Sequence, residues 1–182
     1  MEDRVCLFAA GRGSFITERS MKYSRRKLQT QKRECVFQQL FLGEFYGADE
    51  KLPHLALFLD DSDLLTELEL DRIEEMPEEE RALLKARCEA VLEKLPELDA
   101  QIGEVSEGWK TSRMSRVDLS ILRLALYEME YDDDVPLKVA INEAVELAKK
   151  YGGDDSPSFV NAILGKLALR LAPQPEGESN AR

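Results

Sequence analysis

Cationic side chains concentrate in one short stretch near the start of the sequence. The stretch contains Lys22, Arg25, Arg26, Lys27, Lys32 and Arg33, interleaved with Gln29, Thr30 and Gln31, which can exchange hydrogen bonds with bases or sugars. A helix start here would add its positive dipole end to these cations and favour phosphate binding. Because no DNA recognition-helix motif is present, the composition fits single-stranded RNA better than duplex DNA. A solvated basic face that merely terminates a helix is the alternative.

Two aromatic residues mark a second candidate site, at a turn between the last two expected helices. Tyr151 and Phe159 flank the Gly-Gly and Ser-Pro pairs of this turn, and Lys149 and Lys150 precede it directly. If the turn lies beside the basic stretch, the rings can stack on bases and the lysines can contact phosphates. Ordinary core packing of both rings is the alternative.

The sequence lacks the usual motifs of catalysis and metal binding. It has no phosphate-binding glycine loop, no dinucleotide fingerprint and no nucleophile elbow. His54 is the only histidine, and the three cysteines are odd in number and widely spaced. A Cys-His pair, a zinc site and a disulfide framework are therefore all disfavoured. We expect a protein that binds without catalysis and needs no cofactor.

Composition favours one soluble helical domain with an uneven charge. The 182 residues are 43% hydrophobic and 34% charged, rich in helix formers, and without an apolar run long enough to cross a membrane. Reduced thiols and no secretory signal predict a cytoplasmic location. Residues 1–35 hold nine Lys and Arg against four Asp and Glu, which gives this part a net charge of +5. Because the whole chain has a net charge of −11, the remaining residues carry −16. Such a chain attracts an anion to one edge and offers a basic protein an acidic body.

The chain divides into an expected leader over 1–20, an all-helical domain over 21–172 and a disordered tail over 173–182. The leader shows no periodicity, and the tail from Pro173 is rich in Pro, Gly, Glu and Ser. Met21 opens the regular part, so we hypothesise that translation naturally starts there. Peptides from residues 1–20 in a mass spectrum of the native protein would contradict this hypothesis.

Helical periodicity defines the elements of the domain. Ser24 is expected to cap a first helix whose later turns are apolar, from Leu28 to Phe45, and which stops at Gly47. Further helices are expected over 54–59, 64–73, 77–109 with a kink or break at Pro96, 117–129, 137–151, and from Ser156 onward. The helix over 117–129 is apolar on most faces and should be central. Asn142 and Glu143, polar within an otherwise apolar helix, should hydrogen-bond to another helix.

Several of these segments together resemble the NusB family. The stretch S-R-R-K-L-Q-T-Q-K-R-E-C-V-F-Q-Q-L-F resembles the family's opening. Three further stretches resemble the family's C-terminal half. They are, in chain order, R-V-D-L-S-I-L-R-L-A-L-Y-E-M, V-P-L-K-V-A-I-N-E-A-V-E-L-A-K-K-Y-G and S-P-S-F-V-N-A-I-L. The resemblance covers about residues 21–170 and is weak from Ala48 to Glu80.

The resemblance implies an all-α fold of two small helical bundles packed into one compact domain. It also implies binding of the boxA element of ribosomal RNA together with the ribosomal protein NusE, within an RNA polymerase antitermination complex that supports rRNA transcription and processing. The expected RNA-binding residues are then Lys22, Arg25, Arg26, Lys27, Lys32, Arg33, Lys150, Tyr151 and Phe159. The expected face towards NusE includes Phe41, Arg116 and Asp118. Two departures from the family pattern put RNA affinity in question: Leu28 to Gln31 dilute the cations, and Ser158 stands where a lysine is common.

Two alternatives stay open. A NusB-like domain can serve as the accessory RNA-binding part of an RNA-modifying enzyme, although this chain has no glycine-rich cofactor motif of its own. The chain can also be a protein-binding helical scaffold or a homodimer formed through an apolar stripe, without any RNA.

Overall fold

The computed structural model describes residues 18–46, 76–106 and 111–172, and in these ranges the chain is helical without a strand. The helices expected over 54–59 and 64–73, with His54, lie outside the described residues. So do the tail and all but the last three residues of the expected leader. The first helix ends at Gly43 and the long helix at Val105, so both end a few residues before the ends that the sequence predicts at Gly47 and Trp109. In the described ranges, no helix combines the length and the apolar character needed to span a membrane.

Helix α1 runs from Glu18 to Gly43 and starts earlier than the sequence predicts. Ser24 lies inside the helix and does not cap it. Serine costs only a few tenths of a kcal/mol inside a helix, and strong helix formers surround it here. The basic stretch therefore begins about one turn into α1, at Lys22, and Arg25 and the cations after it lie about two turns or more from the helix start. The favourable field of a helix N-terminus fades within the first turn. The helix dipole therefore does not add to phosphate binding by these cations, contrary to the prediction.

Helix α5, Glu78–Val105, confirms the predicted apolar stripe and resolves the question of Pro96. The helix continues through Pro96, which lies on its exposed side. The buried residues keep one phase on both sides of this proline: Leu84, Cys88, Val91, Leu98, Ile102 and Val105. A proline that faces solvent interrupts a backbone hydrogen bond without turning the buried face away from the core.

Helix α6, Arg116–Tyr131, is the central helix that its sequence predicts. A short 3₁₀ turn, η1 (Thr111–Arg113), precedes it, and the Ser115 hydroxyl caps it by accepting from the Asp118 N–H at 3.1 Å. The run from Leu119 to Leu126 is buried throughout. The helix packs against α1, α5, α7 and α8, so one apolar helix connects all the others.

Helices α7 (Leu137–Tyr151) and α8 (Ser156–Leu171) meet at the tight turn predicted from its glycines. A Cβ on Gly152 would lie 2.5 Å from the Ser156 Cβ and 2.7 Å from the Ala148 carbonyl oxygen, so this position requires glycine. The Ser156 hydroxyl accepts from the Gly153 N–H at 3.0 Å. The two helix ends are thus fixed close together.

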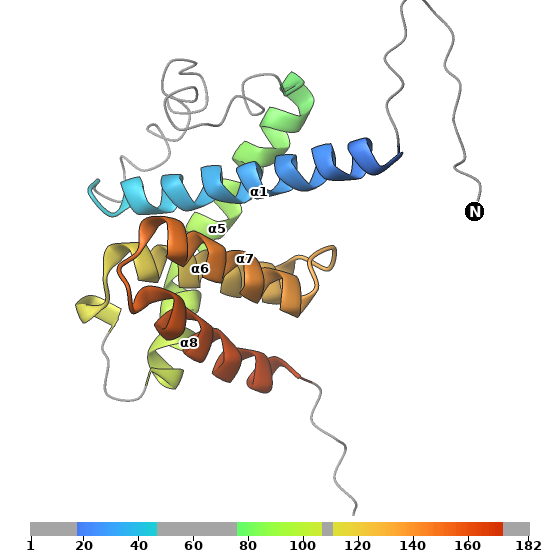
Figure 1. The fold of residues 1–182 in the computed structure, drawn as a ribbon. Helices are drawn as coiled ribbons and strands as arrows, with labels where there is room; N and C mark the ends of the chain where they lie inside the picture. The colour runs from blue at the N-terminus through green and yellow to red at the C-terminus, as the bar shows by residue number, and fades with distance from the viewer. Residues whose placement is uncertain (1–17, 47–75, 107–110, 173–182) are drawn as a thin grey trace, which may run out of the picture.

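The helices form two small bundles in one body. Figure 1 shows α1 lying across the long α5, with α6, α7 and α8 gathered on one side of α1. Contacts of α6 with α1 and with α5 join the pair formed by α1 and α5 to the group formed by α6, α7 and α8. The N-terminal turns of α1 extend beyond the other helices (Figure 1), whereas its second half contributes Cys35, Val36, Phe37 and Leu40 to the core.

Candidate nucleic-acid interface

The candidate interface begins at the projecting part of α1. Arg26, Lys27 and Gln29 are exposed there. The backbone places Lys22 and Arg25 in the same helical segment; their side chains lie outside the described residues. Exposed cations on a protruding helix can approach a phosphate without first breaking an internal ion pair.

The next two cations of α1 are bound to carboxylates of other helices. Lys32 Nζ lies 3.1 Å from Glu80 Oε2 of α5. Arg33 Nε donates to both carboxylate oxygens of Glu128 on α6, at 2.9 and 3.0 Å. Lys32 is partly exposed and its pair is accessible to solvent, but the Arg33 side chain is only 12% exposed. Of the two, Arg33 is placed to hold α1 on α6.

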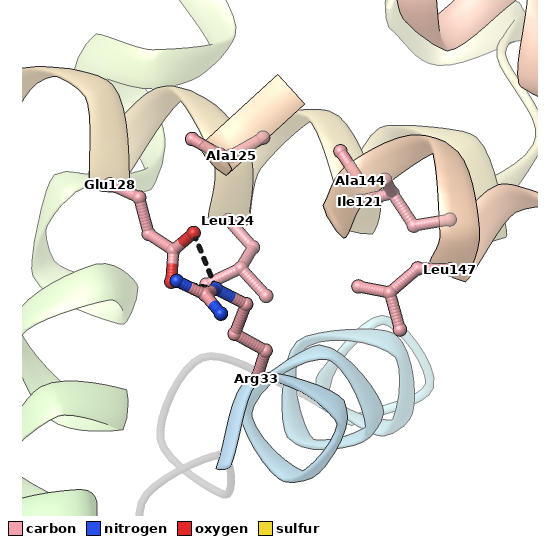
Figure 2. A pocket seen from close by; sticks show the side chains of 8 residues that line it. Arg33, Ile121, Leu124, Ala125, Glu128, Ala144 and Leu147 are labelled. Atoms are coloured by element: carbon pink, nitrogen blue, oxygen red, sulfur yellow. Dashed lines mark hydrogen bonds and ion pairs between the residues drawn. The ribbon is translucent and has the colours of Figure 1, made fainter. Parts of the chain in front are cut away.

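Glu128 is the centre of a larger ion-pair network, of which Figure 2 shows the bond with Arg33. Besides Arg33 it accepts from Arg87 Nη2 of α5 at 2.7 Å, and Arg87 Nη1 lies 2.6 Å from Asp132 Oδ2. Burial raises the pKa of Glu128, although both guanidinium groups act to lower it. Glu128 is 1% exposed. A carboxylate so deeply buried requires its two cations, since an unpaired buried charge is very costly.

Glu143 of α7 completes the contacts of α1 in this region. It accepts from the Thr30 hydroxyl at 3.2 Å and lies 3.6 Å from Arg33 Nη1. The prediction of a helix-to-helix hydrogen bond is confirmed at Glu143. For Asn142 it is wrong, because Asn142 is exposed and makes no such bond to the described residues. Beside Arg33, a small hollow between α1, α6 and α7 is lined mainly by alanine, leucine and isoleucine side chains (Figure 2) and has no room for a water molecule. It is a packing gap and offers no ligand site.

The aromatic candidate Tyr151 lies beside α1, one to two turns beyond the ion-paired cations. Its ring packs on Phe37 with centroids 4.9 Å apart, and its hydroxyl contacts Glu34 and Gln38 of α1. Lys150 Nζ lies 2.5 Å from Glu34 Oε1 and 5.2 Å from the centre of the Tyr151 ring. Tyr151 is half-buried and packs against the core, so the core-packing interpretation holds in part, while base stacking by this ring stays a prediction.

Phe159 lies in the first turns of α8 and packs partly against the core. The turn at Gly152 brings the start of α8 close to the end of α7. The structure thus brings Lys150 and Tyr151 to α1, and holds Phe159 on the helix that follows them.

The three residues expected to face a protein partner gather at the other end of α1. The Phe41 ring meets Phe45 edge-on at 5.4 Å, and the Arg116 guanidinium lies 4.4 Å from the centre of the Phe45 ring. Phe45 was expected to join the core, but it follows the end of α1 and is 59% exposed. Asp118 is buried in the first turn of α6, and its Oδ1 accepts no hydrogen bond from the described residues.

The described ranges contain neither a candidate metal site nor a reactive thiol. No group of three His, Cys, Asp or Glu side chains there is arranged to hold a metal ion. Cys35 and Cys88 are free and buried. Burial raises the pKa of Cys88 to about 12 and that of Cys35 well above its usual range. Both thiols are therefore unreactive core residues.

Sequence reasoning missed the carboxylates that organise the interface: Glu34, Glu80 and Glu128. A signal for one of them exists, because Gln31, Glu34, Cys35 and Gln38 follow helical spacing and share the buried face of α1. An acid on that face needs a partner. The identity of the partner, on α7, required the fold.

The fold and the interface define an all-helical module with a projecting cationic helix and a partly stacked aromatic beside it. The sequence pattern of the NusB family matches residues 30–169. The "Transcription antitermination protein NusB" of Agathobacter rectalis is 49% identical over 75% of this chain and 95% of its own length. The protein of the same name from Lachnoclostridium phytofermentans is 47% identical, covering 74% of this chain and 94% of its own length. The structure of T. maritima NusB matches with a TM-score of 0.60 and 34% identity, covering 79% of this chain and 92% of that one.

The chain therefore belongs to the NusB family. This confirms the family resemblance and the all-helical architecture that its sequence implies.

Proposed function

We propose that this protein is a transcription antitermination factor that binds boxA-type ribosomal RNA together with the ribosomal protein NusE. The observation that carries the proposal is family membership: the chain covers 95% of a relative named a transcription antitermination protein. It acts by binding and not by catalysis, in the cytoplasm, within an antitermination complex on RNA polymerase. Its contribution is to hold the nascent RNA and the partner on one surface.

The RNA contact begins at the projecting turns of α1 and runs along that helix towards α7. Arg26 and Lys27 are exposed and can neutralise phosphates directly. We place Lys22 and Arg25 with them because they share the same helical segment. Lys32, Lys150, Tyr151 and Phe159 extend the surface, while Arg33 acts mainly by holding α1 in place.

The protein contact lies at the opposite end of α1. The exposed Phe45 ring, with Arg116 above it and Phe41 beside it, offers an aromatic anchor of the kind common in protein interfaces. Asp118 supplies a carboxylate at this end of α6. The acidic body, −16 outside residues 1–35, suits a basic ribosomal protein. RNA and partner thus occupy separate parts of α1 and its neighbours.

A titration of boxA RNA at two salt concentrations, with and without NusE, tests the proposal. We expect weak binding by either protein alone and cooperative binding by both, because each extends the RNA surface of the other. A boxA sequence with scrambled bases is the control for nonspecific phosphate binding. Binding of NusE without any gain in RNA affinity would indicate a protein scaffold, and light scattering that shows a stable dimer would indicate a homodimer. Either result contradicts the proposal.

A further inference from the structure

Glu34 is an acid on the buried face of α1, at the junction with α7. It is 6% exposed and lies in the same turn as the core residue Cys35. Its Oε1 accepts from Lys150 Nζ at 2.5 Å and from the Tyr151 hydroxyl. Gln38, one turn further along α1, donates to the same hydroxyl at 3.1 Å. One buried carboxylate therefore holds two neighbouring side chains at the end of α7.

These contacts leave Tyr151 with a defined orientation. Phe37 supports its ring, Glu34 and Gln38 hold its hydroxyl, and Lys150 lies near its face. Burying a carboxylate is costly unless it is paired and hydrogen-bonded. A hydrophobic residue at position 34 would fill this space at a lower desolvation cost, but it would remove the carboxylate that binds both the Tyr151 hydroxyl and the Lys150 ammonium.

We infer that Glu34 is a positioning residue of the RNA interface, which sets Tyr151 and Lys150 in the arrangement that receives a nucleotide beside α1. This inference rests on the proposed RNA-binding function and names a residue that controls it. Glu34 itself does not contact the RNA. The Lys150 side chain remains 47% exposed, so a phosphate can approach its ammonium group from solvent.

Two physical effects of Glu34 have opposite signs, which makes the inference testable. As a negative charge near the RNA, Glu34 repels phosphate, so its removal alone would tighten binding. As a positioning group, it supplies an acceptor for Tyr151, so its removal would weaken binding. Glu34→Gln removes the charge but keeps an acceptor oxygen, whereas Glu34→Ala removes both.

The deciding experiment compares these variants by fluorescence anisotropy of labelled boxA RNA with NusE present. We expect Glu34→Ala to weaken binding about tenfold and Glu34→Gln to stay within about threefold of the wild type, since the amide rescues the hydrogen bond. Glu146→Gln is the matched control, because it removes an exposed acid of α7 that pairs only on the surface with Lys149. Tighter binding by both Glu34 variants would overturn the inference, as would equal weakening by both.

Folding of each variant is monitored by urea denaturation and by its affinity for NusE. Should Glu34→Ala fail to fold, Tyr151→Phe replaces it, because this variant keeps the ring and removes only the hydroxyl that Glu34 holds. Weakening by threefold or more then supports the inference, and unchanged RNA binding overturns it.

A readout without RNA separates failure of the inference from failure of the proposed function. Burial and the Glu34 carboxylate raise the pKa of Tyr151 above its usual range. We expect Glu34→Gln to lower the pKa of Tyr151. The measurement follows the part of the tyrosinate absorbance that is missing in Tyr151→Phe, which separates Tyr151 from the other tyrosines. An unchanged titration overturns the inference even if RNA binds. If the wild type binds no boxA RNA, the proposed function fails together with the RNA role of Glu34, while a lowered pKa would still establish their contact.

Discussion

The two halves of the basic stretch on α1 share a composition but differ in what surrounds them. Arg26 and Lys27 are exposed on turns that project beyond the other helices. Lys32 and Arg33 lie one to two turns further along, where α5, α6 and α7 approach, and both pair with carboxylates. The first pair can bind an external anion at once, while the second pair already binds internal ones.

The difference shows that the number of cations overstates the charge available to RNA. A guanidinium bonded to a buried carboxylate contributes little field outside the protein, and its removal is paid for in stability. A half-exposed pair such as Lys32 with Glu80 lies between the two cases, because its net free energy is small and phosphate can replace the carboxylate. The solvent exposure of each cation therefore predicts its contribution to RNA binding better than its position in the sequence does.

Glu128→Ala should have the largest effect, on stability. It leaves Arg33 and Arg87 facing each other without their shared carboxylate, and we expect a loss of about 3–5 kcal/mol in the free energy of unfolding. Urea denaturation measures this loss. The control is Arg170→Ala, which breaks an exposed pair with Glu104 and should cost less than about 1 kcal/mol. Equal losses in the two variants would mean that the inner half of the stretch is not structural.

The double variant Arg26→Ala with Lys27→Ala should act on RNA binding and leave stability unchanged. Each lost contact to single-stranded RNA removes roughly 0.7 from the slope of log affinity against log salt, so the slope should fall by about 1.4. RNA titrations with NusE present, between low and physiological salt, measure it. Urea denaturation should match the wild type, because neither side chain is buried.

The matched control for this pair is Lys166→Ala with Arg170→Ala, which removes the same charge from α8. Both residues lie in the second half of α8, beyond Phe159, and Figure 1 shows that this end of the helix lies away from α1. A slope that falls equally in the two double variants would show that only net charge matters. Such a result would contradict a defined interface on the projecting turns of α1.

Much of the fold was predictable because its helices carry clear local signals. The stripe of α5 kept its phase across Pro96, α7 ends where Gly152 follows it, and the run from Leu119 to Leu126 is apolar on most faces. The predicted start of α1 was wrong because Ser24, although typical of a cap, costs only a few tenths of a kcal/mol inside a helix, so the surrounding chain decides between the two positions.

The site was predictable only in its residue types. Lys150 and Tyr151 were singled out, but their contact with Glu34 joins residues more than a hundred positions apart, and no local pattern encodes it. The pairing of Arg33 with Glu128 was missed for the same reason. An arginine looks alike in the sequence whether it faces solvent or a buried carboxylate, so the division of the basic stretch into two halves required the packing of α6 against α1.

Glu80→Gln should give the smallest effect of these variants. The direction of the change in RNA affinity tests whether phosphate can replace the carboxylate that pairs with Lys32. It frees the Lys32 ammonium from its partner at 3.1 Å and removes a negative charge near the RNA path. We expect RNA affinity to rise about two- to threefold, since an exposed ion pair is worth roughly 0.2–1 kcal/mol. Stability should change by no more than that amount. Glu79→Gln, exposed on the neighbouring position of α5, is the control for charge alone. If both variants raise the affinity equally, the gain comes from the lost negative charge alone and not from the release of Lys32, which would contradict the intermediate position of Lys32 between the two halves.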